Sequence, residues 1–452
     1  MLSTSNPSSQ AIRGAFLDFA NDPFYVSDAE SVRYIPDGLL IVENGAIADF
    51  GSYADLQAKY SEVEIVTYPG KLIMPGFIDT HIHYPQSEMI AAYGEQLLEW
   101  LNKYTFPTER KFRDKAYAQT IASLFLDELL KNGTTTALVF ATVHPQSVDA
   151  FFEEANRRNL RMISGKVLMD RNAPDFLTDT PETAYEESKQ LIQKWHNKGR
   201  LLYAITPRFA ITSTHEQLRL AGKLLQEFPD VYLHTHLSEN LKEVEWVAEL
   251  FPECKDYLDV YDRAGLVGEK SVFAHGIHLS EDEFKRLSAA KAALSFCPTS
   301  NLFLGSGLFK LHKAKSLNQP IKVGLGTDVG GGTSFSMLHT LNEAYKVAQL
   351  QTESLSAFKA LFLATLGGAR ALSLEDKLGN FDPGKEADFV VLDLQATSIM
   401  ATRTGGLSTR LAQGSTETEL QEELAEKVFG MMMLGDDRTI HAVYIAGELV
   451  HR

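Results

Sequence analysis

The sequence predicts an α/β fold, a (β/α)8 TIM-like barrel with a small β-sandwich domain built from both ends of the chain. Two observations predict it. Strand-like and helix-like stretches alternate through the middle of the chain, and both ends consist of short apolar runs separated by turn residues. The length of 452 residues suits one large barrel with a smaller domain. We place the barrel at 74–379 and the β-rich domain at 1–73 and 380–452; a doubly wound parallel sheet is the alternative.

The first expected elements are the strands of the β-rich domain. Between residues 11 and 73, apolar runs such as "GLLIVENGAIADFG" are divided by turn residues, and the "ENG" at 43–45 is typical of a β-hairpin. Near the other end of the chain, "GKEADFVVLDL" and "IHAVYIAGELV" have the same pattern. We therefore expect strands from the two ends to form one domain.

The middle of the chain contains the strands and helices expected of the barrel. Stretches with helical spacing lie between most of the apolar runs, and one of them ends at Gly133, a typical C-terminal capping residue. Another, "TPETAYEESKQLIQKWHNKG", begins with Thr180 as candidate N-cap and Pro181 at the first helical position, and it closes on Gly199. The eight expected strands are 77–83, 134–142, 161–169, 201–206, 231–236, 271–275, 292–297 and 321–328.

Composition and charge exclude some functions. The chain has 43 Lys+Arg against 59 Asp+Glu, a net charge of −16, and no basic run, so we expect no binding to nucleic acid or to a membrane. No apolar run approaches the ~18 residues of a membrane span, and the polar "MLSTSNPSSQ" lacks the apolar region of a signal peptide. The two cysteines, Cys254 and Cys297, fit a reducing compartment. We expect a cytoplasmic protein.

Polar side chains gather where the expected barrel strands end, which is the face that carries the active site in such barrels. In "THIH", two histidines separated by one residue lie on the same face of a strand. Four of the 13 histidines fall at strand ends that would share a rim with an aspartate. These residues are His81, His83, His236, His275 and Asp328, and Glu239 follows His236 by three positions.

Imidazole and carboxylate groups in this combination suit Zn²⁺ or Fe²⁺. His234 competes with His236, because both lie on one face of the same strand and spacing alone does not separate them. We select His236, which is nearer the strand end and nearer Glu239.

Nine segments carry a resemblance to a known family. "PGFIDTHIHYPQ", "HTHLSEN", "FAHGIHLS", "CPTSNLFLGSG" and "GLGTDVGGG" together resemble the amidohydrolase superfamily. "EQLLEWLNKYTFPTE", "NGTTTALVFATVHPQS", "ITPRFA" and "MLGDDR" narrow the resemblance to the guanine deaminases, with the bacterial form closest. The resemblance covers essentially the whole chain.

The resemblance implies a zinc-dependent hydrolase that removes the amino group at C2 of free guanine, giving xanthine and ammonia. It implies a homodimer with one zinc per chain, Fe²⁺ being the alternative; two-metal relatives usually take a bridging lysine from strand four, and "LLYAITPRFA" contains none. The implied metal ligands are His81, His83, His236, His275 and Asp328. Glu239, Asp328 and His275 would be catalytic, and Gln86, Arg208, Phe209, His83 and His236 would contact the substrate.

These residue types suit that reaction. A metal lowers the pKa of bound water from about 15.7 to roughly 7, and Asp328 can accept the proton. Glu239, with a pKa raised by burial, can protonate ring atom N3 and then the leaving amine. Arg208 offers only donors, which match the C6 carbonyl of guanine and not the C6 amino group of adenine, and Gln86 can offer both a donor and an acceptor. The alternative substrate is another aminated heterocycle, such as a pterin, a triazine or another purine.

Several residues are weaker candidates. Trp100 either borders the purine pocket or packs in the core, and Asn301 either lines the mouth of the site or belongs to loop structure. We expect Lys166 and Cys297 to be structural. "GNFDPGKE" resembles a phosphate-binding loop, but Glu386 replaces the hydroxyl residue and a strand-like run follows where a helix is needed, so we interpret it as a turn.

Overall fold

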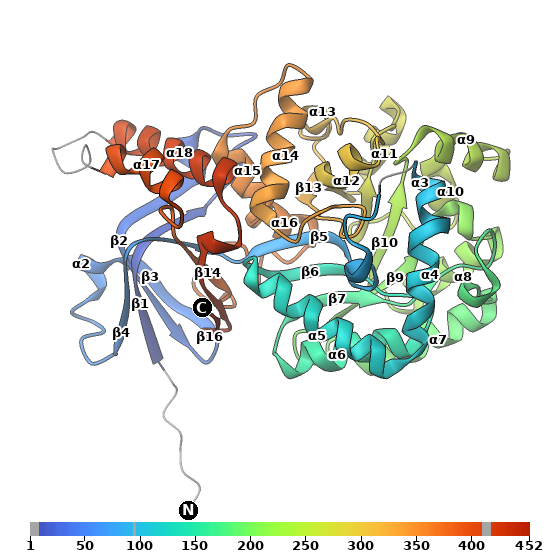
Figure 1. The fold of residues 1–452 in the computed structure, drawn as a ribbon, viewed down its shortest axis with the longest axis horizontal. Helices are drawn as coiled ribbons and strands as arrows, with labels where there is room; N and C mark the ends of the chain where they lie inside the picture. Colours follow the sequence, from blue (N-terminus) through green and yellow to red (C-terminus); the bar gives the residue numbers. More distant parts are fainter. Residues whose placement is uncertain (1–8, 94–95, 409–416) are drawn as a thin grey trace, which may run out of the picture.

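The computed structural model describes residues 9–93, 96–408 and 417–452. Two parts lie side by side, a strand barrel surrounded by helices and a smaller sheet that contains strands from both ends of the chain (Figure 1). The predicted fold class is therefore confirmed. The domain boundaries after residue 73 and before residue 380 stay a prediction.

The barrel is a parallel sheet whose first and last strands meet. Closure is made by backbone hydrogen bonds from Asp328 N–H to the His81 carbonyl and from His83 N–H to the Val329 carbonyl, both 2.9 Å. The expected strand 161–169 is divided into two short strands around Lys166. The barrel strands are β5 (Phe77–His83), β6 (Thr134–Phe140), β7 (Arg161–Gly165), β8 (Val167–Leu168), β9 (Leu202–Pro207), β10 (Tyr232–Leu237), β11 (Ser271–His275), β12 (Ala293–Phe296) and β13 (Lys322–Leu325).

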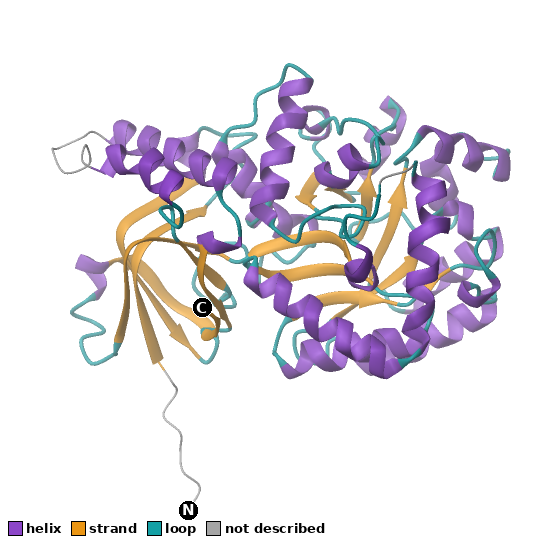
Figure 2. Ribbon diagram, viewed as in Figure 1, coloured by secondary structure: helices purple, strands orange, loops and turns teal. Residues whose placement is uncertain are grey.

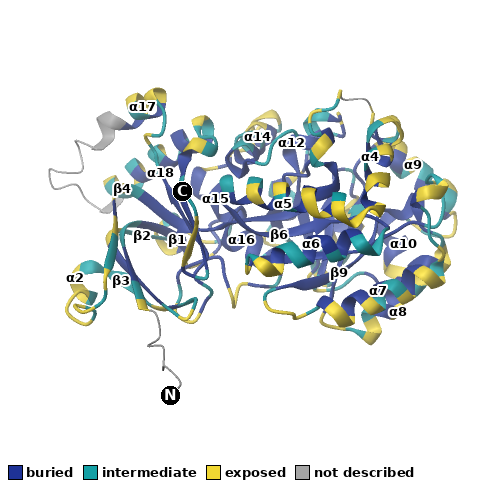
Figure 3. Ribbon diagram, turned by 60° about the horizontal axis from the view of Figure 1, so that its bottom comes forward, coloured by how far each residue is buried: buried dark blue, intermediate teal, exposed yellow. Residues whose placement is uncertain are grey.

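Helices surround these strands, and their outer faces carry most of the exposed residues while the strands are buried (Figures 2 and 3). Apolar residues at helical spacing face the barrel, so one continuous hydrophobic core lies between the two layers. The helices are α5 (Lys115–Lys131), α6 (Pro145–Arg157), α7 (Pro181–Trp195), α8 (His215–Glu227), α9 (Leu241–Leu250), α10 (Tyr257–Arg263), α11 (Glu281–Ala289), α12 (Pro298–Phe303), α13 (Leu311–Ala314), α14 (Met337–Leu350), α15 (Ala357–Leu363) and α16 (Leu366–Ala371).

The expected helix signals are largely confirmed. Gly133 follows the end of α5 with φ of 77°, a conformation that favours glycine. The Thr180 hydroxyl accepts a hydrogen bond from Thr183 N–H at 3.2 Å, so it caps α7 as expected. The helix does not continue to Gly199, however. It ends at Trp195 because the next residue, His196, is extended.

The smaller sheet has seven strands in the order β16-β15-β14-β4-β1-β2-β3. β1 and β4 pair in parallel, and the other neighbours are antiparallel. The hairpin expected at 43–45 joins β2 to β3 through Asn44 and Gly45, with φ of 52° and 81°. The strands are β1 (Ser9–Phe19), β2 (Val32–Glu43), β3 (Ala46–Ser52), β4 (Ile65–Pro75), β14 (Phe389–Leu392), β15 (Ile440–Ile445) and β16 (Glu448–His451), with the short helices α1 (Asp28–Ser31) and α2 (Tyr53–Leu56) between them.

Two helices in the C-terminal region differ from the all-strand pattern we expected there. They are α17 (Ser398–Ser408) and α18 (Glu417–Leu434), which lie above the smaller sheet in Figure 1. α18 packs against α14 and α15 of the barrel. Its buried residues Leu424, Val428, Met431 and Met432 follow helical spacing, which is the signal our interpretation of this region overlooked.

A long connection between β5 and α5 lies over one end of the barrel. It consists of one-turn segments, namely η1 (Tyr84–Met89), α3 (Leu97–Trp100), η2 (Leu101–Thr105), α4 (Phe106–Glu109) and η3 (Arg110–Arg113). Further short turns are η4 (Asp175–Leu177), η5 (Ala210–Thr212) and η7 (Asp437–Thr439). Within the described ranges, every helix is too short or too polar to cross a bilayer.

Gly165 tests the close packing of the barrel strands. A Cβ atom at this position would lie 1.7 Å from the backbone carbonyl oxygen of Ala204 in β9, and backbone cannot move aside as a flexible side chain can. We expect Gly165→Ala to destabilise the fold by about 3 kcal/mol and to lower the thermal midpoint clearly. Gly268→Ala is the control, because its new Cβ would meet only the Ser271 hydroxyl at 4.0 Å. Equal midpoints for the two variants would contradict this account of the packing.

Candidate active site

The end of β5 directs two imidazoles into the barrel. His81 and His83 are two positions apart, so they share the inner face of the strand, and both are buried. Their Nε2 atoms lie 3.2 Å apart. Two ring nitrogens at this distance need either a shared proton or a common cation between them.

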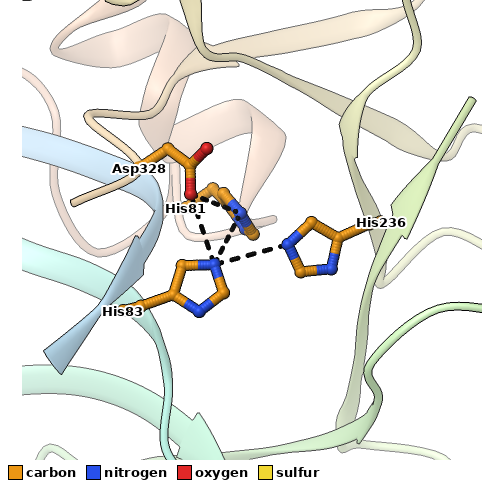
Figure 4. Close-up of side chains that lie close together, drawn as sticks. All are labelled: His81, His83, His236 and Asp328. Atoms are coloured by element: carbon orange, nitrogen blue, oxygen red, sulfur yellow. Dashed lines mark hydrogen bonds and ion pairs between the residues drawn. The ribbon is translucent and has the colours of Figure 1, made fainter. Parts of the chain in front are cut away.

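Four side chains converge on one point at this end of the barrel (Figure 4). Asp328 Oδ1 lies 3.2 Å from Nε2 of both His81 and His83, and His236 Nε2 lies 3.3 Å from His83 Nε2. The candidate ligand atoms of these four residues all lie within 4.8 Å of one another, so together they could hold a metal ion. Three imidazole nitrogens and one carboxylate oxygen are a donor set that divalent transition metals favour.

Hydrogen bonds at the Nδ1 atoms, which face away from the group of four, orient the imidazoles of His236 and His81. His236 Nδ1 lies 2.7 Å from the Arg208 carbonyl, which can only accept, so Nδ1 carries the proton and the Nε2 lone pair faces the group. His81 Nδ1 lies 2.7 Å from His234 Nε2. His234 therefore stands behind His81 and outside the group of four. The structure thus separates His236 from His234, which strand spacing could not do.

Burial favours the neutral form of His83, His236 and His275, which is the form that a metal ligand needs. It lowers the pKa of His83 to about 4 and that of His275 to about 3, and it lowers the pKa of His236 well below its ordinary value. Burial alone would raise the pKa of Asp328. The neighbouring imidazoles, with His81 foremost, reverse this effect and hold that pKa well below its usual range, so Asp328 is a carboxylate.

The backbone is strained where β11 and β13 deliver their polar residues. His275 has φ of 72° and Asp328 has φ of 51°, values that are uncommon for residues other than glycine. Non-glycine residues held in this region cluster at functional sites, because the surrounding structure must impose the conformation. Here it turns each side chain from the strand end toward the centre of the barrel.

His275 lies beside the group of four. Its Nε2 atom is 3.9 Å from Asp328 Oδ2 and 3.5 Å from Glu239 Oε2, and it has no hydrogen-bond partner among the described residues. Its Nδ1 atom lies 2.9 Å from the Asn301 amide. With Cys297 and Asp328 it forms a second, overlapping group that could hold a metal. The ligand role expected of His275 stays a prediction.

Glu239 is a buried carboxyl close to this centre. Its Oε1 accepts a hydrogen bond from the Ser306 hydroxyl at 3.0 Å, and its backbone N–H donates to Glu243 at 2.8 Å. Burial, followed by the negative charge of Asp328, raises the pKa of Glu239 well above its ordinary value. A carboxyl in this state can keep its proton at neutral pH and donate it. Sequence reasoning did not find Ser306, which lies in an irregular loop.

A pocket opens next to the convergent group and contains the predicted substrate residues Gln86, Arg208 and Phe209. Trp100, for which we left two interpretations open, also lines it. The full lining consists of His83, Gln86, Leu97, Trp100, Leu101, Arg208, Phe209, His236, Glu239, His275, Leu304, Asp328 and Gly331. The lining thus combines apolar and aromatic side chains with several polar groups, as sites for small molecules do.

Sequence reasoning also missed Glu109, a buried residue behind the pocket. Arg208 Nη1 donates to both Glu109 oxygens at 2.9 Å, and Gln86 Nε2 donates to Oε1 at 3.4 Å. The side-chain carbonyl of Gln86 accepts from Gly330 N–H at 3.1 Å, so one amide N–H has no bond among the described residues. The expectation that Gln86 offers the ligand both a donor and an acceptor stays a prediction.

The weaker candidates occupy the places that their sequence context suggested. Lys166 is buried in an ion pair with Asp179, away from the convergent group. Cys297 is buried, and its thiol donates to the Ser295 carbonyl at 3.5 Å. Asn301, for which we left two interpretations open, lies in α12, and its side-chain amide is 2.9 Å from His275 Nδ1.

Comparisons with known proteins agree with this geometry. Residues 72–450 match the amidohydrolase family. The chain is 54% identical to the guanine deaminase of Escherichia coli K12 over 446 residues, which is 98% of each chain. The crystal structure of guanine deaminase from Bradyrhizobium japonicum superposes with a TM-score of 0.95 at 43% identity, covering 98% of this chain and 99% of that one. The guanine deaminase of C. acetobutylicum, whose structure contains bound guanine in its active site, gives a TM-score of 0.85 at 29% identity, covering 98% and 100%.

A match over most of the chain, together with relatives far above 30% identity, leaves no ambiguity about the family. This chain belongs to the amidohydrolase family and, within it, to the guanine deaminases.

Proposed function

We propose that this chain is a hydrolase acting on the C–N bond of a cyclic amidine, and that it converts free guanine and water to xanthine and ammonia. One observation carries the proposal. The pocket that holds the buried carboxyl of Glu239 also presents the donors of Arg208 and Gln86, next to a group of side chains that could hold a metal. Relatives named guanine deaminase at 54% and 46% identity support this choice of substrate.

We propose one zinc ion per chain, with Fe²⁺ as the alternative. His81, His83, His236 and Asp328 would hold it, and His275 is the fifth residue that the family resemblance implies. The fit rests on the crowded ring nitrogens, with Nε2 of His81 and His83 only 3.2 Å apart, and on the burial that favours the neutral form of His83 and His236. A divalent ion supplies Lewis acidity that makes water nucleophilic at neutral pH.

Asp328 and His275 would manage the proton of the attacking water. Asp328 directs Oδ1 toward the imidazoles, so Oδ2 can accept that proton while the water oxygen adds to C2. His275 Nε2, which lies 3.9 Å from Asp328 Oδ2 and 3.5 Å from Glu239 Oε2, can hydrogen-bond the same oxygen. These two contacts orient the water toward one face of the ring.

Glu239 would supply the proton that the ring needs. Addition of water makes C2 tetrahedral and places electron density on N3, which Glu239 can protonate from its neutral state. The bond between C2 and the exocyclic amino nitrogen then breaks. A proton delivered through Glu239 to this nitrogen lets it leave as ammonia. The Ser306 hydroxyl, 3.0 Å from Oε1, holds the carboxyl in position.

Arg208 and Gln86 would select the purine. Both direct N–H donors to the pocket, and these donors match acceptors of guanine such as O6. Adenine has an amino group at C6, which would leave a buried arginine facing another donor. Phe209, His83 and His236 would border the ring, since each lines the pocket.

We also propose that the chain is a cytoplasmic homodimer with a role in guanine catabolism. The free cysteines Cys254 and Cys297 agree with a reducing compartment. The dimer is an inference from the family alone, and sedimentation of the purified protein decides it.

His236 tests the assignment of the metal ligands. We expect His236→Ala to lose most of the one equivalent of zinc that we propose, because it removes one of four donors. His278→Ala should keep the zinc of the unaltered protein, because His278 bonds the Ser306 carbonyl at 2.9 Å and lies outside the group. Metal content after dialysis, measured by mass spectrometry, distinguishes the two. Full zinc retention by His236→Ala would mean that another residue is the ligand.

Turnover of guanine tests the function itself. Ammonia release should occur with guanine and not with adenine, and Glu239→Gln should lower kcat by about 10²–10⁴-fold, because an amide cannot transfer the proton. The variant keeps the size of the side chain and should keep its zinc. If the zinc-loaded protein releases no ammonia from guanine but does so from a pterin or a triazine, the pocket recognises another heterocycle.

A further inference from the structure

Glu109 is a carboxylate with no solvent contact that lies at the end of α4, behind the pocket wall. Both of its oxygens accept from Nη1 of Arg208 at 2.9 Å, and Oε1 also accepts from Gln86 Nε2 at 3.4 Å. It does not line the pocket itself. Its side chain therefore joins the two residues that present donors to the pocket, although they come from different parts of the chain.

The geometry of this ion pair leaves part of Arg208 free. Within the described part of the chain, the hydrogen bonds of its guanidinium to other residues all start from Nη1. Arg208 lines the pocket, so the donors on Nε and Nη2 remain for a ligand there. Glu109 thus binds Nη1 of the guanidinium and fixes the direction in which Nε and Nη2 point.

Gln86 is constrained from two sides. Gly330 N–H can only donate, so it fixes the Gln86 carbonyl, and the carboxylate of Glu109 can only accept, so it fixes the amide nitrogen. One N–H of this amide is used by Glu109. The second N–H is left for the pocket, which makes Gln86 a donor to the ligand.

The charge of Glu109 also determines where Arg208 can rest. Arg208 is almost fully buried, and an unpaired buried charge is costly. The pocket contains two other carboxyl groups, those of Glu239 and Asp328. Without Glu109, the guanidinium would be drawn toward the negative charge of Asp328 and away from the position in which it meets a substrate.

We propose that Glu109 is a specificity-determining positioning residue, which holds Arg208 and Gln86 so that their free N–H groups select a purine with a carbonyl at C6. This inference rests on the proposed function. Glu109, Arg208 and Gln86 would together recognise the C6 substituent, and Glu109 would do so without touching the ligand.

Two inhibitors test this role through binding alone. Hypoxanthine has the C6 carbonyl and lacks the 2-amino group, whereas purine lacks both. We expect Glu109→Gln to weaken hypoxanthine binding by at least about tenfold, the usual effect of losing a charge-assisted hydrogen bond. Purine binding should change by less than about threefold, the size of an effect remote from the ligand. With guanine as the substrate, Glu109→Gln should mainly raise KM and change kcat little.

Matched variants separate positioning from general damage. Asp22→Asn is the control, because it removes the carboxylate of another buried pair, with Lys315 at 2.6 Å, whose cavity shares no residue with the pocket. Asp22→Asn should leave the ratio of hypoxanthine affinity to purine affinity unchanged. Glu109→Asp retains the charge on a shorter side chain and should restore part of the ratio. An equal loss for hypoxanthine and purine in Glu109→Gln would overturn the proposal.

A double variant keeps the test decisive if Glu109→Gln does not fold. Glu109→Leu combined with Arg208→Met removes both buried charges. Its ratio of hypoxanthine to purine affinity should fall no more than about threefold below that of Arg208→Met alone, because only the Gln86 contact at 3.4 Å is then left to lose. A further fall of about tenfold or more would contradict action through Arg208. Guanine turnover by the unaltered protein is measured first. Its absence would count against the proposed function, while calorimetric binding of the two inhibitors would still decide the role of Glu109.

Discussion

The closure of the barrel between its first and last strands is the constraint on which the site depends. The buried carboxylate of Asp79 in β5 accepts from the Thr327 hydroxyl at 2.5 Å, from Thr327 N–H at 3.2 Å and from His81 N–H at 3.1 Å. It therefore joins the residue before Asp328 to the residue at which the histidine pair begins. These hydrogen bonds of Asp79 hold together the two strand ends that deliver three of the four convergent side chains.

Burial then gives each polar group one protonation state. Burial favours the neutral form of the His83, His236 and His275 imidazoles, whereas the pKa of Asp328 stays well below its usual range because its contacts with His81 and His83 outweigh the effect of burial. Glu239 lies 3.5 Å from His275, and burial together with the negative charge of Asp328 raises its pKa, so the same environment favours its protonated form. Two carboxyl groups in one pocket would thus suit opposite roles, one as proton acceptor and one as proton donor.

The elements in which apolar residues recur at a regular spacing could be predicted from the sequence. The eight barrel strands and the residues at their ends follow from alternation and from the rule that barrels place function at the C-terminal strand ends, which is how His81, His83 and Asp328 were found. His236 and His234 share a face, so only packing could distinguish them. Glu109 and Ser306 lie in short irregular segments without a period, and their importance comes from contacts with residues that are far away in the sequence. Helix α18 did have a helical pattern, which the flanking apolar strands obscured.

Hydrolysis and recognition are carried by different structural layers. The residues that could hold a metal come from strand ends, where any displacement would require the barrel to deform. The residues that face the rest of the ligand come from connections, with Gln86 in η1, Glu109 in α4 and Arg208 just after β9. Among the described residues, the Glu109 carboxylate bonds only Arg208 and Gln86, so this position in α4 could change with little effect on the strands. In the proposed function, the barrel would therefore fix which bond is hydrolysed, and the long connection after β5 would help to determine which heterocycle is presented to it.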